Sequence, residues 1–323
     1  MIRIGTRGSA LALWQARTVA AEIEQTTGHA PEIVVIRTSG DESQGPPDAE
    51  QPLNVKATFV KQIEDALLDG RVDLGVHSSK DLPAVLPEGL RLAAAIPRGD
   101  PRDALILPVG RARDFADAAR GPVQRARDFP AIVGTLGPHP RLGTSSVRRM
   151  AQLRSLIPSA RFLPIRGNVD TRLRKLDAGE CDALVLAAAG LERLGLGDRI
   201  SLALEPDVCL PAPGQGIVAI ETSDRASADL LAITAALNDP DTWDALMAER
   251  ALVRELGGGC QMPLGALATV DGQRVNIYGV VISVNVSQAI RASAAGNRGN
   301  AAAAGERLAA LLLEKGAGRL LRE

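Results

Sequence analysis

The sequence predicts an α/β protein with two doubly wound lobes, a cleft between them and a small α+β domain at the C-terminal end. Short apolar runs alternate with amphipathic segments through the first two-thirds of the chain, which is typical of parallel sheets covered by helices. The length of 323 residues fits two or three domains. Beyond about residue 239 the pattern changes to alternating strands followed by an alanine-rich helix, which predicts the third domain.

The first predicted unit begins with a strand and a capped helix. Apolar runs predict strands at residues 2–5, 32–38, 72–76 and 90–96. Ser9 can cap a helix over residues 9–27, and an amphipathic pattern predicts a second helix at 59–68. The polar segment 39–55, rich in glycine and proline, is expected to form a mobile loop.

The same alternation recurs in a second unit. Its expected strands cover residues 104–107, 131–135, 161–165 and 183–187, and its expected helices cover residues 146–156 and 169–176. Pro138 and Pro140 argue against a central strand directly before Gly143, because proline cannot donate a ladder hydrogen bond.

An insertion is indicated in the same region, because R-A-R-D-F occurs at 111–115 and again at 125–129. We expect the added loop to bulge outward and to leave Arg148 and Arg149 in place.

A Pro/Gly-rich segment at 209–216 (C-L-P-A-P-G-Q-G) predicts that the chain crosses back to the first lobe. A strand at 217–221 would join the first sheet, and a helix at 225–237 would follow. The predicted domains are residues 1–100 with 217–237, residues 101–216, and residues 238–323. The last domain is expected to contain a helix at 242–256, strands at 266–270, 274–282 and 284–292, and a helix at 301–315.

Composition argues against several classes of protein. No window approaches the ~18 consecutive apolar residues of a membrane span, and the N-terminal residues lack the apolar core of a signal peptide, so we expect a cytoplasmic protein. Three distant cysteines and three histidines argue against a disulfide framework and a metal site. A net charge of −1 and only seven aromatic residues argue against nucleic-acid binding.

The cationic residues are unevenly distributed. Arginine outnumbers lysine 32 to 5, and a GC-rich genome would explain that average. Residues 141–175, however, carry nine cationic side chains and one carboxylate, a local charge of +8. Guanidinium groups match carboxylate or phosphate oxygens in pairs, so this segment indicates a site for several anionic groups. Scattered surface arginines paired with acids elsewhere are the alternative.

Three strand-to-helix loops combine small or hydroxyl residues with arginine: 7–9 (R-G-S), 143–149 (G-T-S-S-V-R-R) and 166–172 (R-G-N-V-D-T-R). Helix N-termini offer free N–H groups and favour anions. Ordinary capping would explain one such loop, whereas three favour a ligand with several carboxylates or phosphates.

Two further segments carry chemically useful side chains. Lys80 and Asp81 follow a predicted strand, where they form either a surface ion pair or an anion-binding lysine beside a general acid/base. Cys260 follows three glycines, which suits a thiol presented where a ligand approaches closely. Cys181 and Cys209 are expected to be buried packing residues.

In their order along the chain, these segments resemble the porphobilinogen deaminase family. The matching segments are G-T-R-G-S-A-L-A-L-W-Q-A (5–16), D-L-G-V-H-S-S-K-D-L-P (73–83), R-G-D-P-R-D-A (98–104), G-T-S-S-V-R-R (143–149), R-G-N-V-D-T-R-L-R-K-L-D (166–177), L-A-A-A-G-L-E-R-L-G (186–195), L-P-A-P-G-Q-G (210–216) and G-G-C-Q-M-P-L-G (258–265).

The resemblance implies two lobes like those of type II periplasmic binding proteins and a third domain with a cysteine loop. It implies a transferase that joins four porphobilinogen molecules head to tail, with loss of ammonia, into hydroxymethylbilane. It also implies a dipyrromethane cofactor, assembled from substrate and held by a thioether to Cys260, with no metal or nucleotide. A cytoplasmic monomer with porphobilinogen as its partner, and no nucleic acid or membrane, is expected.

The resemblance also implies roles for individual residues. Asp81 would face the pyrrole nitrogens, stabilise the positive charge formed when ammonia leaves and assist proton transfer. The expected cofactor-binding residues are Lys80, Asp81, Thr144, Ser146, Arg148, Arg149, Arg172 and Cys260. The expected substrate-binding residues are Arg7, Ser9, Arg166, Arg172 and Arg193. Lys56 and Phe59 would lie on or beside a mobile loop over the site.

The chain departs from the family pattern mildly at Gly8 and Ala10 and more strongly in two other places. Residues 54–59 read N-V-K-A-T-F where the family has G-G-K-G-L-F, and the region between residues 107 and 143 is longer. A non-catalytic or altered anion-binding protein on the same two-lobed scaffold is the alternative function. That alternative explains the arginines but neither the glycine-flanked Cys260 nor the third domain.

Overall fold

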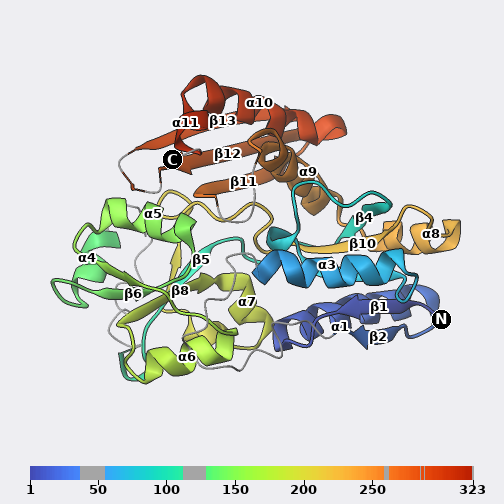
Figure 1. Ribbon diagram of the computed structural model, residues 1–323, viewed down its shortest axis with the longest axis horizontal. Helices are drawn as coiled ribbons and strands as arrows, with labels where there is room; N and C mark the ends of the chain where they lie inside the picture. Colours follow the sequence, from blue (N-terminus) through green and yellow to red (C-terminus); the bar gives the residue numbers. More distant parts are fainter. Residues whose placement is uncertain (37–54, 112–128, 258–261, 284, 287, 322–323) are drawn as a thin grey trace. The chain divides into compact units, whose positions relative to one another are not determined.

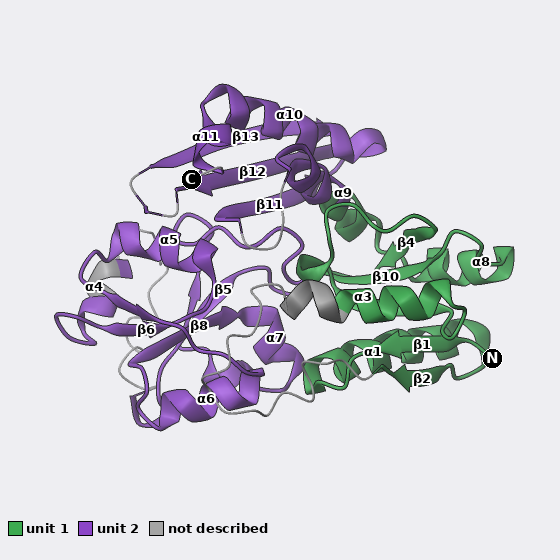
Figure 2. Ribbon diagram, viewed as in Figure 1, with its two compact units in different colours: residues 1–98, 217–246 green, residues 99–216, 247–323 purple. Residues whose placement is uncertain are grey.

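The computed structural model describes residues 1–36, 55–111, 129–257, 262–283, 285–286 and 288–321 (Figure 1). The chain divides into two compact units (Figure 2). Unit 1 comprises Met1–Arg98 and Ile217–Leu246, and unit 2 comprises Gly99–Gly216 and Met247–Glu323. The predicted α/β class with a further small sheet is confirmed. The three-domain boundaries stay a prediction.

Unit 1 is built on a five-stranded mixed sheet of order β2-β1-β3-β10-β4. Its strands are β1 (Arg3–Thr6), β2 (Glu32–Val35), β3 (Leu74–Ser78), β4 (Leu90–Ala95) and β10 (Val218–Ser223). β1 runs parallel to β2 and β3, whereas β10 runs antiparallel to β3 and β4. The strand expected after residue 216 therefore does return to the first sheet.

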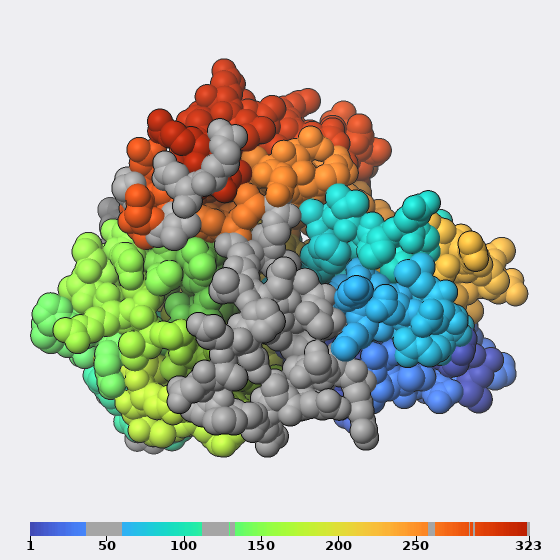
Figure 3. All heavy atoms as spheres, viewed as in Figure 1, coloured from blue at the N-terminus to red at the C-terminus, as the bar shows by residue number. Residues whose placement is uncertain are grey.

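Helices cover both faces of this sheet. α1 (Ala10–Thr27) and α8 (Ala228–Leu237) pack on one face, where their apolar side chains share a core with those of β1, β3 and β10. α3 (Val55–Leu68) packs on the other face. α8 lies at the surface of unit 1, in gold in Figure 3.

Unit 2 contains a second five-stranded sheet, of order β7-β6-β8-β5-β9. Its strands are β5 (Asp103–Ile106), β6 (Arg141–Gly143), β7 (Arg161–Leu163), β8 (Ala183–Ala187) and β9 (Leu202–Leu204). One face is covered by α4 (Phe129–Gly134) and α5 (Val147–Leu156), and the other by α6 (Val169–Asp177) and α7 (Ala188–Arg193).

The two sheets share one topology, which differs from the expected all-parallel pattern. β6, β7 and β8 are parallel, and β5 runs antiparallel to β8 and β9, as β10 does in unit 1. A parallel strand needs a covering crossover connection. β5 and β10 instead each follow a passage of the chain from one unit to the other, so no such connection precedes them.

The strand predicted at 131–135 is wrong, because these residues belong to α4 and to the turn after it. A short apolar run does not distinguish a strand from a buried helix, and Phe129 and Val133 lie four residues apart with both side chains buried. The actual strand is β6, which starts directly after Pro140. Pro140 uses its carbonyl to accept a hydrogen bond from Arg161 N (2.9 Å). The insertion is expected at 111–142, and residues 112–128 of it lie outside the described residues; its outward bulge stays a prediction.

A three-stranded antiparallel sheet follows, formed by β11 (Leu264–Asp271), β12 (Arg274–Ile282) and β13 (Ala289–Asn297). α10 (Ala301–Glu314) packs on β12 and β13. β13 begins five residues later than the 284–292 expected from sequence. α9 (Pro240–Glu255) precedes this sheet, and the short α11 (Ala317–Leu320) follows α10. Among the described helices, none is both long and apolar enough to cross a membrane.

The contact between α10 and α9 leads to a first prediction. A Cβ atom on Gly305 would lie 2.0 Å from the carbonyl oxygen of Ala248 and 2.9 Å from Leu252 N, so the helices must separate if it is added. We expect Gly305→Ala to lower the free energy of unfolding by about 1–3 kcal/mol, although alanine favours helices by about 1 kcal/mol over glycine. Urea unfolding of the whole protein, parent against variant, measures this difference.

Gly318→Ala is the matched control, because a Cβ atom there would lie 3.4 Å from Leu313 Cδ2, an ordinary contact. A Gly305→Ala variant as stable as the parent would contradict the close packing of the two helices.

Candidate functional site

In unit 1, four of the predicted site residues lie at one edge of the sheet. β1 and β3 are parallel neighbours, so their C-terminal ends meet at the same edge. Arg7 and Ser9 follow β1, while Lys80 and Asp81 form the 3-10 turn η1 (Ser79–Asp81) that follows β3. All four side chains are partly exposed. This edge therefore presents two cations, a hydroxyl and a carboxylate to solvent or to a ligand.

The two loops at this edge are fixed by neighbouring elements. Ser9 is the N-cap of α1, and its Oγ accepts a hydrogen bond from Ala12 N. Ser78 Oγ accepts from Gln15 Nε2 of α1 (2.8 Å), and Ser79 N donates to the carbonyl oxygen of Ile217 (2.9 Å). The start of η1 is thus attached to α1 on one side and to the residue before β10 on the other.

Unit 2 gathers a second group at the ends of its parallel strands. Thr144 and Ser146 follow β6, Arg166 follows β7, and Arg193 is the last residue of α7, which follows β8. Ser146 is the N-cap of α5, where its Oγ accepts a hydrogen bond from Arg149 N. The helix predicted at 146–156 is confirmed as α5. The N-terminus of α5 combines hydroxyl groups with free backbone N–H groups, which favours anions.

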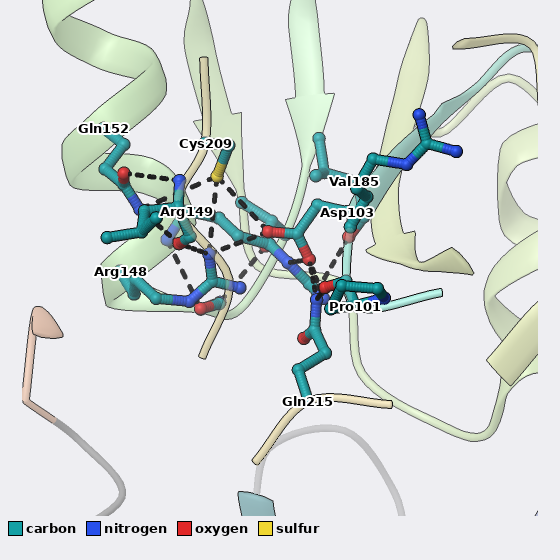
Figure 4. A network of polar contacts seen from close by, with 12 residues as sticks. Pro101, Asp103, Arg148, Arg149, Gln152, Val185, Cys209 and Gln215 are labelled. Atoms are coloured by element: carbon teal, nitrogen blue, oxygen red, sulfur yellow. Dashed lines mark hydrogen bonds and ion pairs between the residues drawn. The ribbon is translucent and has the colours of Figure 1, made fainter. Parts of the chain in front are cut away.

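Asp103, the first residue of β5, lies at the centre of a buried polar network next to this helix (Figure 4). Its Oδ2 accepts from Arg148 Nη1 (2.7 Å) and from Cys209 Sγ (3.3 Å). Its Oδ1 accepts from Arg149 Nε (2.9 Å) and from Gln215 Nε2 (2.9 Å). Asp103 is 0% exposed, and Arg148 and Arg149 are only 5% and 7% exposed.

The same side chains also bind backbone groups. Arg148 Nη1 donates to Leu210 O (2.7 Å), and Arg149 Nη1 donates to Val185 O (2.9 Å). Gln152, one turn further along α5, donates to Leu210 O (2.9 Å) and accepts from Leu210 N (2.8 Å). The network therefore joins β5, α5, β8 and the Pro/Gly-rich segment at 209–216.

The charges of this network do not cancel. Burial alone would raise the pKa of Asp103, but Arg148 and Arg149 outweigh it and hold that pKa well below its usual range. Burial raises the pKa of the Cys209 thiol to about 12. At neutral pH one carboxylate thus faces two guanidinium groups and a neutral thiol, which leaves one positive charge beside the N-terminus of α5.

The other predicted site arginines of unit 2 differ in their surroundings. Arg166 is exposed. Arg172 Nε donates to Gly167 O (2.6 Å) at the start of α6, and Arg193 Nη2 donates to Gly216 O (2.6 Å). Burial lowers the pKa of Arg193, which nevertheless stays cationic at neutral pH. These contacts fix the guanidinium groups of Arg172 and Arg193 on the backbone carbonyls of Gly167 and Gly216.

Three of the predicted site residues cannot be placed in full. Cys260 lies outside the described residues. Lys56 and Phe59 belong to the first turns of α3, but their side chains also lie outside the described part of the chain. Cys181 and Cys209 are buried, as expected, and burial raises the pKa of the Cys181 thiol to about 11. Neither described thiol is ionised at neutral pH.

Sequence reasoning missed Asp103, Gln152 and Gln215. A carboxylate at the head of the apolar strand A-L-I-L was the available signal, because a buried charge needs a partner. Within the described ranges, no group of three or more His, Cys, Asp or Glu side chains is placed to hold a metal ion.

Comparisons with known proteins agree over most of the chain. A family model described as "Porphobilinogen deaminase, dipyromethane cofactor binding domain" matches residues 2–230, and "Porphobilinogen deaminase, C-terminal domain" matches residues 243–314. Relatives named porphobilinogen deaminase from Syntrophotalea carbinolica and Chromobacterium violaceum are both 44% identical to this chain. The alignments cover 99% of this chain, and 95% and 96% of those relatives respectively.

Similar solved structures include substrate-binding proteins. The second substrate-binding domain of an amino acid ABC transporter from Streptococcus pneumoniae covers 79% of this chain and 94% of its own, with a TM-score of 0.43 and 11% identity. The ancestral amino acid-binding protein AncCDT-1 covers 73% of this chain and 86% of its own, with a TM-score of 0.35 and 12% identity.

The Asp103 network leads to a second prediction. Asp103→Asn would leave two buried guanidinium groups facing a neutral amide, and breaking a buried pair in this way costs about 3–5 kcal/mol. We expect that loss in the free energy of unfolding at neutral pH, measured by urea unfolding.

Asp182→Asn provides the control, because Asp182 also accepts from an arginine, Arg141, but that pair is partly exposed. We expect Asp182→Asn to lower the free energy of unfolding by less than about 1 kcal/mol. If both variants lower the free energy of unfolding equally, the burial of Asp103 adds nothing to the stabilisation by its ion pairs.

Proposed function

The chain belongs to the porphobilinogen deaminase family, and from this premise we propose which of its residues carry the reaction. It is a transferase of tetrapyrrole (heme and porphyrin) biosynthesis, also called hydroxymethylbilane synthase. It joins four porphobilinogen molecules head to tail, with loss of ammonia, into hydroxymethylbilane, and it uses a dipyrromethane cofactor.

The cationic strand ends of the two units support these roles most strongly. Every pyrrole of substrate, cofactor and product carries an acetate and a propionate side chain, so the growing chain is a polycarboxylate. Guanidinium groups, hydroxyls and helix N-termini are the groups that bind carboxylates best. The donors at the ends of β1, β3, β6 and β7 are of this kind, so the described residues fit the cofactor chemically.

The cofactor, when bound, supplies the pyrrole to which the first substrate is joined. Its proposed attachment is a thioether to Cys260. The residues proposed to hold its carboxylates and those of the growing chain are Lys80, Thr144, Ser146, Arg148, Arg149 and Arg172. The residues proposed to hold the incoming substrate are Arg7, Ser9, Arg166, Arg172 and Arg193. Lys56 and Phe59 are proposed as further contacts.

Asp81 is the proposed catalytic residue. Departure of ammonia from porphobilinogen leaves positive charge on the pyrrole, and a nearby carboxylate stabilises that charge. When protonated, the Asp81 carboxyl group can give its proton to the leaving amine, and the resulting carboxylate can take the proton that the pyrrole carbon loses as the new carbon–carbon bond forms. Its place in η1, a short turn attached to α1 and β10, restricts its motion.

Arg148 and Arg149 are proposed to act on the ligand carboxylates mainly through their electrostatic field. Their guanidinium groups are almost fully buried and bound to Asp103 and to backbone carbonyls. A buried positive charge acts more strongly than an exposed one, because little water screens it. The residual charge would attract carboxylates to the hydroxyl and N–H groups at the N-terminus of α5.

We further propose that the protein works as a cytoplasmic monomer and takes neither nucleic acid nor membrane as a partner. The net charge of −1 and the scarcity of aromatic residues support the absence of nucleic acid among its partners.

Substitution of Asp81 tests the catalytic proposal. General acid/base catalysis typically contributes a factor of about 10²–10⁴. We therefore expect Asp81→Asn to retain the covalent cofactor but to lose at least about 100-fold in kcat for hydroxymethylbilane formation. Ammonia release and bilane absorbance measure the rate, and intact mass measures the cofactor.

The control is Asp69→Asn, at an exposed carboxylate in the same unit, which should leave the rate unchanged. If Asp81→Asn with bound cofactor turns over within about threefold of the parent, Asp81 has no acid/base role.

A further inference from the structure

Three ionisable side chains lie buried on one face of the unit 1 sheet, away from the Asp103 network. Gly75 of β3 is opposite Glu221 of β10, and His77 is opposite Ala219. Because side chains alternate along a strand, His77 and Glu221 point to the same face. Glu64 comes from α3, which packs against β3 and β10 on that face. All three side chains are buried.

One close contact and the packing of α3 on the sheet define this cluster. His77 Nε2 lies 3.0 Å from Glu221 Oε2. A Cβ atom on Gly75 would lie 2.8 Å from His77 Nε2 and 2.9 Å from Ile63 Cγ2, so glycine leaves the space that the imidazole ring occupies. Within the described part of the chain, both carboxylate oxygens of Glu221 and Oε1 of Glu64 lack a hydrogen-bond partner. The cluster is not placed to hold a metal ion.

Such a cluster is unfavourable for stability by itself. Buried ionisable groups lose the solvation of water, and an apolar face would pack here at lower cost. Its place in the sheet suggests what it does. His77 directly precedes Ser78, whose Oγ is bound by Gln15, and Ser79 begins η1. The cluster therefore supports the C-terminal end of β3 from a further direction. The other supports come from α1 and from the residue before β10.

The charge of the cluster depends on Glu64. Burial, and then the negative charge of Glu221, raise the pKa of Glu64 from 4.5 to about 7, and Asp65 adds to this effect. His77 and Lys61 oppose it. Below about pH 7 Glu64 is neutral, and above it two carboxylates repel each other beside one imidazole.

We propose that the Glu64–His77–Glu221 cluster positions the Ser78–Asp81 turn, and that the turn loosens when Glu64 ionises. The consequence for turnover rests on the proposed role of Asp81 in that turn. Loosening moves the carboxylate of Asp81 away from its reactive position, so kcat falls while KM for porphobilinogen changes little. Glu64, His77 and Glu221 are thus positioning residues.

The sign of the pH dependence follows from the raised pKa. The folded protein binds the proton of Glu64 more tightly than the unfolded chain does. Its contribution to stability is therefore complete below about pH 4.5 and is lost as the pH rises through about 7. The stability of Glu64→Gln relative to the parent should accordingly increase between about pH 5 and pH 8.

The test compares Glu64→Gln with Asp69→Asn, an exposed carboxylate directly after the same helix that does not contribute to the shift of Glu64. In the parent and in Asp69→Asn, we expect kcat to fall as the pH rises above about 7. In Glu64→Gln that fall should shift upward by at least about one pH unit or disappear, with KM unaffected. Retention of the parent profile in a folded Glu64→Gln variant would overturn the proposal.

A second measurement needs neither a variant nor turnover. Amide hydrogen exchange of residues 78–82 in the parent holoprotein should be faster, after correction for intrinsic rates, at about pH 8 than at about pH 6. Equal protection at both pH values would also overturn the proposal. If the parent shows no turnover, the proposed function fails, and the exchange measurement still decides the role of the cluster.

Discussion

Two buried arginines, Arg148 and Arg149, share the carboxylate of Asp103, and the placement of the surrounding segments of unit 2 depends on these ion pairs. Transfer of such charges from water costs several kcal/mol per ion, which only close pairing and further hydrogen bonds offset. Backbone carbonyls on β8 and in the 209–216 segment provide those further bonds. The same contacts that offset the loss of hydration therefore fix α5, and with it the loop of Thr144 and Ser146.

A related arrangement occurs in unit 1. In both five-stranded sheets, an antiparallel strand follows the passage of the chain between units and lies beside the third parallel strand. That antiparallel strand carries a buried carboxylate in each case, Asp103 on β5 and Glu221 on β10. Its partners are two arginines in unit 2, but a histidine and a second carboxylate in unit 1. The first network is consequently cationic at neutral pH, whereas the charge of the second varies with the protonation of Glu64.

Local signals made most of the fold predictable from sequence. Ser9 caps a helix as expected, because a hydroxyl before an amphipathic run satisfies free backbone N–H groups. The strand predicted at 131–135 is wrong, because a run so short has no distinguishing period. The site loops were predictable as strand ends, but Asp103 was not. Its importance comes from contacts with residues 45 to 112 positions away, which no local pattern contains.

The proposed attachment of the cofactor to Cys260 provides the most direct test of the transferase and its polycarboxylate site. The measurement is the intact mass of the denatured protein, followed by peptide mapping across residues 243–314, after incubation with porphobilinogen or preformed hydroxymethylbilane. We expect a mass excess equal to two linked pyrrole units, located on the peptide that contains Cys260 and absent from Cys260→Ala. An unmodified Cys260 peptide after both incubations would contradict the assignment of the cofactor, and with it the reaction.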